Sequence, residues 1–236
     1  MVDILGKALL DYTLGNYTED IITYSSLDET DSIPIPYLFR TYKEMPVLEQ
    51  QALKLCKGTI LDIGCGAGSH SNYLQENGFS VMALDYSKGA IETCKFRGIK
   101  EVALTEINAY SEKKFDTLLL LMNGIGLAGK LNELSSFFSK LKSLLNPGGQ
   151  IILDSSDIIY MFEEDEDGGY WFPDNSEYYG EVEFTMEYKG EKGNSFPWLY
   201  IDYNTLQRAA LSNGLECVLI TEGEHYDYLA KITVIK

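Results

Sequence analysis

The sequence lacks the features that mark membrane-spanning, secreted or metal-binding chains. It has no run of about 18 consecutive apolar residues, so no membrane-spanning helix is expected. Its N-terminus shows no basic segment followed by an apolar one, and we expect no secretory signal. Its four cysteines include no C-x-x-C pair and match neither a zinc site nor a dense disulfide framework. These absences predict a cytoplasmic protein with reduced thiols and no bound metal.

Basic residues are also scarce. There are 19 lysines and arginines against 36 aspartates and glutamates, which gives a formal net charge of −17. Such a charge repels a phosphate backbone, whereas proteins that bind nucleic acids normally carry a basic patch. We therefore expect no nucleic-acid partner, no membrane partner and a small-molecule substrate. The 17 tyrosines leave a homodimer surface open.

Four segments can be distinguished along the 236 residues. Residues 1–56 have the pattern of a helical lead-in or cap, with an amphipathic helix over 3–12 and a second helix over 46–56. Residues 57–155 alternate strands with helices. This alternation predicts a parallel sheet with helices on both faces.

The last two segments extend this arrangement. Residues 156–203 begin with an irregular acidic stretch, after which residues 181–189 alternate strictly between apolar and polar. That strand can pair with residues 197–203 as an added β-hairpin. Residues 204–236 have the pattern of a helix followed by two strands, which we expect to complete the core sheet.

The most informative motif is a glycine-rich loop, Asp62-Ile63-Gly64-Cys65-Gly66-Ala67-Gly68, between a predicted strand and a predicted helix. Glycines let the backbone turn tightly and approach a ligand, and the helix N-terminus behind the loop attracts anionic groups. A dinucleotide fingerprint, G-x-G-x-x-G, would need glycine at position 69 or 71, and both positions hold serine. The loop therefore indicates a nucleotide-like ligand of another kind.

Asp85 follows the next predicted strand, 17 residues after Gly68. A carboxylate at this place can accept hydrogen bonds from both hydroxyl groups of a ribose. The alternative is an acidic residue that only stabilises the following helix N-terminus. With the glycine loop nearby, the ribose role is favoured.

These motifs resemble those of the class I S-adenosylmethionine (SAM)-dependent methyltransferases. The glycine loop resembles motif I of that family, and Asp85 stands where the family keeps its ribose-binding acid. Phe115-Asp116 resembles the start of the family's fourth strand, and Asn146-Pro147-Gly148-Gly149 resembles the lead into its fifth. The resemblance implies an α/β fold: a Rossmann-like three-layer sandwich with a mostly parallel seven-stranded sheet and an antiparallel last strand. The N-terminal helices and the β-hairpin would be additions to it.

The resemblance also implies SAM as the cofactor and S-adenosyl-L-homocysteine (SAH) as its product. The glycines would surround the methionine part, Asp62 would orient the loop or the amino group, and Tyr86 would lie beside the adenine. Asn108-Ala109 stands in place of the family's usual Asp-Ala pair near the adenine amine, and an asparagine can accept the same hydrogen bond without charge. The residues expected to contact the cofactor are Asp62, Gly64, Cys65, Gly66, Gly68, Ser69, His70, Asp85, Tyr86, Ser87, Asn108, Ala109, Met122, Asn123 and Gly124.

Two residues are candidates for catalysis. His225 lies in the turn between the last two predicted strands, and histidine titrates near neutrality, so it could deprotonate an acceptor; a surface histidine is the alternative. Asn123 follows the fourth parallel strand but lacks the prolines and aromatic residue of the Asn-Pro-Pro-Tyr motif of amino methyltransferases. A simple turn explains Asn123 equally well.

The sequence thus predicts a SAM-dependent methyltransferase that transfers a methyl group in line to a small-molecule acceptor. The sulfonium already activates the methyl group, so positioning supplies much of the catalysis. We expect the N-terminal helices and residues 156–203 to choose the acceptor. The alternatives are a non-catalytic SAM-binding sensor or partner subunit, and a nucleotide-dependent oxidoreductase on a related fold.

Overall fold

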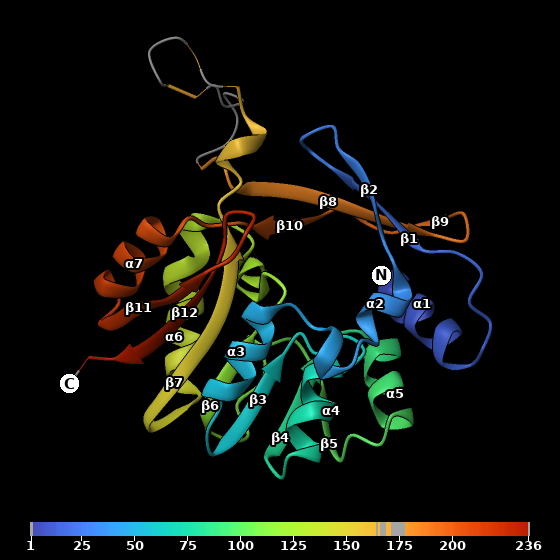
Figure 1. Ribbon diagram of the computed structural model, residues 1–236, viewed down its shortest axis with the longest axis horizontal. Helices are drawn as coiled ribbons and strands as arrows, with labels where there is room; N and C mark the ends of the chain where they lie inside the picture. Colours follow the sequence, from blue (N-terminus) through green and yellow to red (C-terminus); the bar gives the residue numbers. More distant parts are fainter. Residues whose placement is uncertain (1, 164, 166–168, 171–177, 236) are drawn as a thin grey trace.

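The computed structural model describes residues 2–163, 165, 169–170 and 178–235, which form two β-sheets with surrounding helices (Figure 1). The central sheet has seven strands in the order β11-β12-β7-β6-β3-β4-β5. They are β3 (Thr59–Ile63), β4 (Ser80–Asp85), β5 (Glu101–Leu104), β6 (Phe115–Leu120), β7 (Leu145–Ser156), β11 (Leu215–Glu222) and β12 (Asp227–Val234). Neighbouring strands are parallel, except that β12 runs antiparallel to both β7 and β11. The predicted fold class is confirmed.

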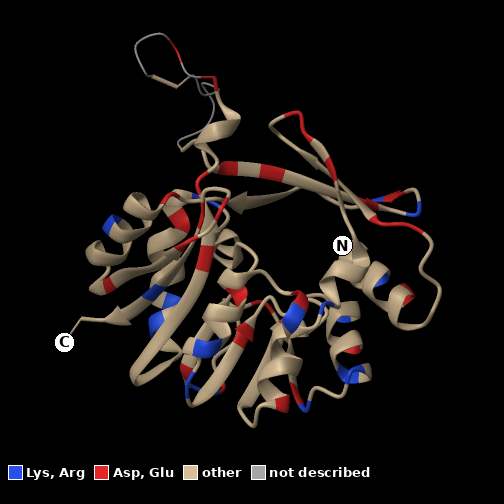
Figure 2. Ribbon diagram, viewed as in Figure 1, with Lys and Arg blue, Asp and Glu red and all other residues tan. Residues whose placement is uncertain are grey.

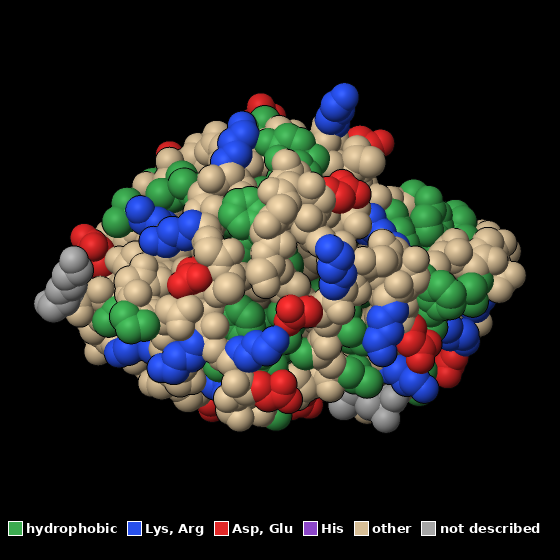
Figure 3. All heavy atoms as spheres, turned by 90° about the horizontal axis from the view of Figure 1, so that it is seen from below, with side chains coloured by type: hydrophobic (Ala, Val, Ile, Leu, Met, Phe, Trp, Pro, Cys, Tyr) green, Lys and Arg blue, Asp and Glu red, His purple; other side chains and the backbone are tan. Residues whose placement is uncertain are grey.

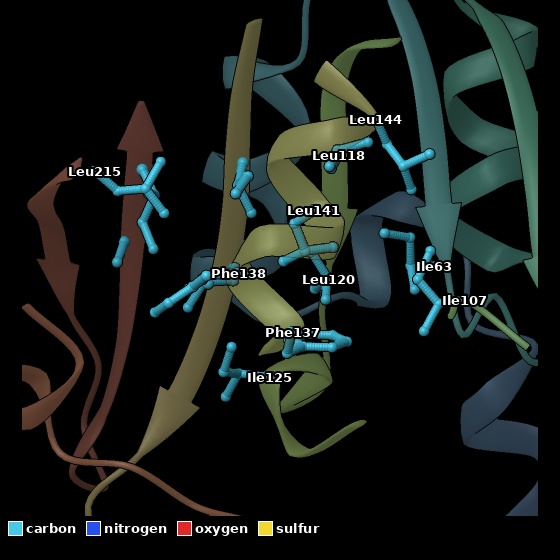
Figure 4. Packing of buried hydrophobic residues seen from close by; sticks show 14 of the residues in the cluster. Ile63, Ile107, Leu118, Leu120, Ile125, Phe137, Phe138, Leu141, Leu144 and Leu215 are labelled. Atoms are coloured by element: carbon cyan, nitrogen blue, oxygen red, sulfur yellow. The ribbon is translucent and has the colours of Figure 1, made fainter. Parts of the chain in front are cut away.

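Helices cover both faces of the central sheet. On one face lie α3 (Val47–Leu55), α4 (Ser69–Glu76) and α5 (Lys88–Phe96), whose apolar side chains pack against β3 and β4. On the other face lie α6 (Leu134–Ser143) and α7 (Tyr203–Ser212). Figure 4 shows Phe137, Phe138 and Leu141 of α6 in one buried cluster with Leu118 and Leu120 of β6. This is the predicted three-layer arrangement.

The central strand β6 shows why its sequence is an unbroken apolar run. Leu118 and Leu120 face α6, whereas Leu119 between them faces the side of α3, and all three are fully buried. A strand covered on both faces has no solvent-exposed positions, so apolar residues do not alternate with polar ones.

A second sheet of five antiparallel strands has the order β10-β8-β1-β2, with β9 paired to β8. The strands are β1 (Ile21–Ser25), β2 (Thr30–Ile33), β8 (Glu181–Tyr188), β9 (Glu191–Lys192) and β10 (Phe196–Leu199). The predicted hairpin is confirmed as the antiparallel pair β8–β10. Figure 1 shows the second sheet lying across the end of the molecule toward which the parallel strands point.

The predicted helical lead-in did not include strands, but residues 21–25 and 30–33 within it form β1 and β2. The two helices of that prediction are present as α1 (Ile4–Thr13) and α3. The strands between them are short, and β2 is largely exposed. They form because β8, far away in the sequence, offers its edge to β1. The proposed segment boundaries themselves stay a prediction.

The apolar side chains of β8 lie on one face of the strand, which faces the rest of the molecule. Val182, Phe184, Met186 and Tyr188 alternate with more polar residues, and Met186 and Tyr188 pack with apolar residues of α1. At the other end, Trp198 of β10 lies so close to Gly126 that a Cβ at position 126 would overlap its indole ring. The second sheet is therefore fixed to the central domain at both of its ends.

Helix α1 is attached to α5 through Asp3. One carboxylate oxygen of Asp3 accepts a hydrogen bond from the Gly6 N–H (2.9 Å), so Asp3 caps the N-terminus of α1. The other accepts from the Ser87 hydroxyl (2.9 Å) and the Gly89 N–H (3.0 Å), at the start of α5. The two helices come closest at Gly6 and Gly89, where a Cβ on Gly89 would overlap the Gly6 backbone. Sequence periodicity alone did not predict this contact.

We expect Gly89→Ala to lower the free energy of unfolding by about 1–3 kcal/mol, because the new methyl group must push two backbones apart. Urea unfolding followed by circular dichroism measures this change. The exposed neighbour Lys88 provides the control, since Lys88→Ala should change stability by less than about 0.5 kcal/mol. Equal stability of Gly89→Ala and wild type would contradict the close helix crossing.

The remaining elements are short. They are α2 (Ile35–Leu38) and the 3-10 helices η1 (Tyr42–Glu44), η2 (Gly124–Ala128), η3 (Leu131–Glu133) and η4 (Ile159–Met161). No helix within the described residues is long and apolar enough to span a membrane. Part of the acidic stretch, including Glu164, Glu166 and Asp167, lies outside the described residues.

Candidate active site

The glycine loop connects β3 to α4 in a left-handed backbone conformation that favours glycine. Gly64, Gly66 and Gly68 have φ values of 73°, 52° and 77°. A Cβ at position 68 would lie 2.8 Å from the sulfur of Cys94, so this side of the loop packs against α5. A Cβ at position 66 would meet no atom within 4 Å. The loop is therefore closed on one side and open beside Gly66.

Asp62 stabilises the loop from the end of β3. It is buried at the end of β3, and its carboxylate accepts a hydrogen bond of 2.6 Å from the Ser71 hydroxyl on α4. Burial raises the pKa of Asp62, against the effects of the His70 charge and of hydrogen bonds from Ser71. The side chain thus joins the strand before the loop to the helix after it. A contact of Asp62 with a cofactor stays a prediction.

Asp85 is the predicted site residue that the structure ties most directly to the glycine loop. One carboxylate oxygen accepts from the Gly66 N–H (2.9 Å), and the other accepts from the Ser87 N–H (2.8 Å). Burial raises the pKa of Asp85, and these two hydrogen bonds oppose that increase. Each oxygen retains a lone pair, because an ionised carboxylate has about four acceptor sites. The carboxylate is held beside the open side of the loop.

Several predicted cofactor residues lie around Asp85. Ser87 is buried and caps α5 through a 3.0 Å hydrogen bond from the Ala90 N–H. Tyr86 is 59% exposed, so its ring is accessible. Asn108 and Ala109 are exposed in the turn after β5. The Thr105 N–H at the start of that turn donates to the Asp85 carbonyl (3.0 Å), which places the turn next to Asp85.

Three other predicted cofactor residues direct their side chains into the protein. The Cys65 sulfur lies 3.7 Å from the Cys94 sulfur, and both are free thiols. The Ser69 hydroxyl donates to the Leu38 carbonyl (2.7 Å), and the His70 ring contacts Glu49 (2.8 Å). These side chains therefore hold the loop in place, and a cofactor contact through their backbone stays a prediction.

His70 belongs to a buried charged cluster. Glu49 of α3 accepts hydrogen bonds from the Arg40 guanidinium at 2.6 Å and 2.7 Å and contacts the His70 Nε2. Burial opposes ionisation of Glu49, but His70 and Arg40 outweigh it and hold its pKa below the ordinary value. Arg40 also donates to the Tyr37 carbonyl (2.9 Å) and stacks over the Tyr37 ring. This Arg40–Glu49–His70 cluster joins the N-terminal segment to the helix behind the glycine loop.

Met122 and Asn123 follow β6 with φ values of 60° and 57°, a left-handed turn that is unusual for residues other than glycine. Both turn their backbone N–H groups toward the carboxylate of Asp154 on β7, at 3.2 Å and 2.8 Å. The Asn123 amide donates to the Leu199 carbonyl and accepts from the Ser155 hydroxyl. Asn123 thus connects β6, β7 and β10, and both polar atoms of its side chain form hydrogen bonds within the protein. Gly124 is buried and begins η2.

Asp154 is a candidate that sequence reasoning missed. It is half-buried near the carboxyl end of β7, beside the end of β6. Burial raises the pKa of Asp154 to about 7, with a further contribution from the charge of Glu49. The backbone N–H groups of Asn123 and Met122 oppose this rise, as does His70. A carboxylate ending an otherwise apolar strand, Ile-Ile-Leu-Asp, was the available signal in the sequence.

His225 lies at the same edge of the sheet, but within the described residues its ring forms no hydrogen bond to the residues around Asp154. The turn that contains it joins β11 to β12, and Asp227 at its end pairs with Ser156 of β7. His225 itself is exposed, and its backbone N–H donates to the Asp227 carboxylate (3.1 Å). The structure therefore favours Asp154, which is bonded to the turn after β6, over His225 as a candidate functional group.

Comparisons with known proteins agree with this arrangement. Residues 61–153 match a family model described as a methyltransferase domain. A solved SAM-dependent methyltransferase from Bacteroides fragilis, in complex with SAH, is 44% identical, with a TM-score of 0.92 over 99% of this chain and 95% of that one. This chain belongs to the SAM-dependent methyltransferases. SAM is therefore its cofactor, and the chain is a methyl-transferring enzyme rather than an oxidoreductase or a non-catalytic binding protein.

Two curated relatives match the central part of this methyltransferase. A cypemycin N-terminal methyltransferase from Streptomyces sp is 29% identical over 103 residues, 42% of each chain. A ubiquinone biosynthesis O-methyltransferase from Pelagibacter ubique is 31% identical over 96 residues, 38% of each chain. The match thus spans about two fifths of either relative, and one of them is named an N-terminal methyltransferase and the other an O-methyltransferase. They leave the acceptor atom open.

Proposed function

We propose that this methyltransferase binds SAM along the open side of the glycine loop and transfers its methyl group to a small molecule at the ends of β6 and β7. The observation that carries this proposal is the hydrogen bond from Gly66 to Asp85, which fixes a carboxylate beside the open side of the loop. In a sheet of this type, ligands bind outside the carboxyl ends of the parallel strands. The loop, Asp85 and Asp154 all lie at that edge.

Individual residues would have distinct roles in cofactor binding. The open backbone around Gly66 suits the methionine part, and the free lone pairs of Asp85 suit the two ribose hydroxyls. Tyr86 and the turn at Asn108 and Ala109 adjoin Asp85, where the adenine would follow the ribose. The reactive methyl group would then face the Met122–Gly124 turn and Asp154.

A small acceptor is supported by the charge and shape of the molecule. Figure 2 shows acidic residues along β8 and the β1–β2 hairpin, which would repel nucleic acids. The opposite end of the molecule, in Figure 3, carries lysine and arginine side chains interspersed with acidic ones. The second sheet, fixed through Trp198 and α1, lies across the carboxyl ends of the strands, where it would cover a bound acceptor.

The acceptor class is tested by incubating the enzyme with radiolabelled-methyl SAM and a cell extract, then separating the products by size. We expect label in the low-molecular-mass fraction, with equimolar formation of SAH. The control is the same incubation after the extract has been passed through a small-molecule desalting column, which should abolish labelling. Label confined to protein or nucleic acid, removable by protease or nuclease, would contradict a small acceptor.

Two further proposals concern the protein in its cell. The four buried free thiols support a reducing, cytoplasmic location. A homodimer is tested by light scattering of the purified protein, which would report a mass of twice 26.6 kDa.

A further inference from the structure

We propose that the acceptor of this methyltransferase is an amine, which Asp154 binds as an ammonium ion and from which Asp154 takes the proton that the nitrogen loses. This inference rests on the proposed function and adds the chemical class of the acceptor. It depends on how Asp154 is held, on which charges surround it and on the aromatic residues nearby.

The Asp154 carboxylate is held in a fixed position with unused acceptor capacity. Each oxygen receives one backbone N–H, from Asn123 at 2.8 Å and from Met122 at 3.2 Å. Both donors lie in the left-handed turn that ends β6, which Asn123 stabilises through its bonds to Leu199 and Ser155. Two of about four acceptor sites are thus used, and a ligand can occupy the others.

No cation of the protein pairs with Asp154 within the part of the chain that the structure describes. The buried cation Arg40 is engaged by Glu49 and by the Tyr37 carbonyl. His70 contacts Glu49 as well. Since a half-buried carboxylate is stabilised by an opposite charge, a cationic ligand would supply the positive charge that pairs with Asp154.

The groups that act on Asp154 come from several elements. Glu49 on α3 adds negative charge near Asp154, and His70 on α4 partly offsets it. Burial raises the pKa of the Tyr37 phenol on α2, and the charge of Asp154 adds to this rise, so the two side chains are close. Tyr37 is 40% exposed, and its ring is held by Arg40. Tyr200 directly follows Leu199, whose carbonyl accepts from the Asn123 amide, and the half-buried Tyr200 ring contacts that of Phe184 on β8. An ammonium ion is attracted by such aromatic faces as well as by the carboxylate.

The transfer step balances with these groups. The ammonium gives one proton to the Asp154 carboxylate and becomes a neutral amine with a free electron pair. That pair forms the new nitrogen–carbon bond as the carbon–sulfur bond breaks, and the bonding electrons remain on sulfur as SAH. The products are a methylated ammonium ion, neutral SAH and a protonated Asp154, which then releases its proton to water. An alkylammonium has a pKa of about 10, far closer to that of Asp154 than an aliphatic hydroxyl is, so proton transfer from nitrogen is the easier of the two.

The test compares benzylamine with benzyl alcohol as probes of the SAH-loaded enzyme, by calorimetry at pH 8. We expect benzylamine to bind at least tenfold more tightly than the alcohol. Asp154→Asn should reduce that preference to less than threefold, and so should lowering the pH to 5.5, where Asp154 is protonated while the probe stays charged. Equal binding of the two probes, no binding of the amine, or an unchanged preference in the variant would each overturn the proposal.

Turnover provides the second readout. With a panel of primary amines and their hydroxyl counterparts, we expect SAH release only with amines and a decrease of about 100-fold in Asp154→Asn. Faster methylation of the hydroxyl compounds, or no methylation of any amine, would overturn the proposal. Asp116→Asn is the matched control, because Asp116 also accepts a backbone N–H, from Thr59 (2.8 Å), but at the opposite edge of the sheet. It should keep the wild-type preference for the amine.

The same experiments separate this inference from the function on which it rests. If the wild type binds neither SAM nor SAH, the proposed function fails. If wild type and Asp154→Asn both bind SAH within about threefold of one another but show no preference for the amine, only the amine proposal fails.

Discussion

Asp85→Ala is expected to weaken SAM binding by at least about 100-fold. Hydrogen bonds to a charged group contribute about 1.5–3 kcal/mol each, so loss of two ribose contacts removes at least about 3 kcal/mol. The substitution also frees the Gly66 and Ser87 N–H groups, whose bonds to Asp85 hold the loop. Calorimetric titration of SAM and SAH into the purified variant measures the change.

Two other variants show whether the loss is specific to Asp85. Asp85→Asn keeps one acceptor oxygen and should lose less affinity than the alanine variant. Asp116→Ala removes a carboxylate with comparable hydrogen bonds to Thr59 at the opposite edge, and it should bind SAM within about threefold of wild type. Undiminished binding by Asp85→Ala would contradict the placement of the ribose.

The second large effect is expected for the buried cluster around Glu49. Glu49→Ala leaves the guanidinium of Arg40 and the ring of His70 without their partner inside the protein, where both are almost fully buried. Removal of one member of a buried ion pair costs about 3–5 kcal/mol, so we expect a decrease of that size in the free energy of unfolding at pH 7. Urea unfolding followed by tryptophan fluorescence measures it.

The pH dependence gives this prediction a second test. The folded-state pKa of Glu49 is lowered, so its ionisation contributes stability that is present above the unfolded value near 4.5 and is lost as pH falls through the folded value. The difference in unfolding free energy between wild type and Glu49→Ala should therefore narrow as the pH falls below the unfolded value. The exposed pair Glu101–Lys113, at 2.8 Å, supplies the control, and Glu101→Ala should cost less than about 1 kcal/mol. A similar cost for both substitutions would contradict a buried cluster.

The Arg40–Glu49–His70 cluster also matters for interpreting Asp154. Because Arg40 and His70 bind Glu49, neither side chain forms a direct ion pair with the Asp154 carboxylate. The cluster therefore joins the N-terminal segment to α4, and within the described residues no lysine or arginine forms an ion pair with Asp154. A ligand that carries positive charge fits this arrangement.

The sequence by itself determined the central domain and the nature of its cofactor. The elements of that domain are encoded locally, by glycines at turns, by helical spacing in residues 131–145 and by the unbroken apolar run of β6. Gly64, Gly66 and Asp85 could be identified because a left-handed loop needs glycine and a strand end places a carboxylate nearby. These requirements act over a few residues, so their signal survives in a single sequence.

Only the tertiary structure decided where the second sheet forms and which acid is bonded to the turn after β6. Strands β1 and β2 are short and carry little apolar pattern, and they exist because β8 supplies a hydrogen-bonding edge from the other end of the chain. Asp154 becomes distinctive only when the turn after β6 directs two N–H groups at its carboxylate, while Arg40 is paired with Glu49. The direction of the Cys65, Ser69 and His70 side chains likewise depends on α5, α2 and α3. Long-range pairing, burial and charge are properties of the folded chain, and no local pattern of residues encodes them.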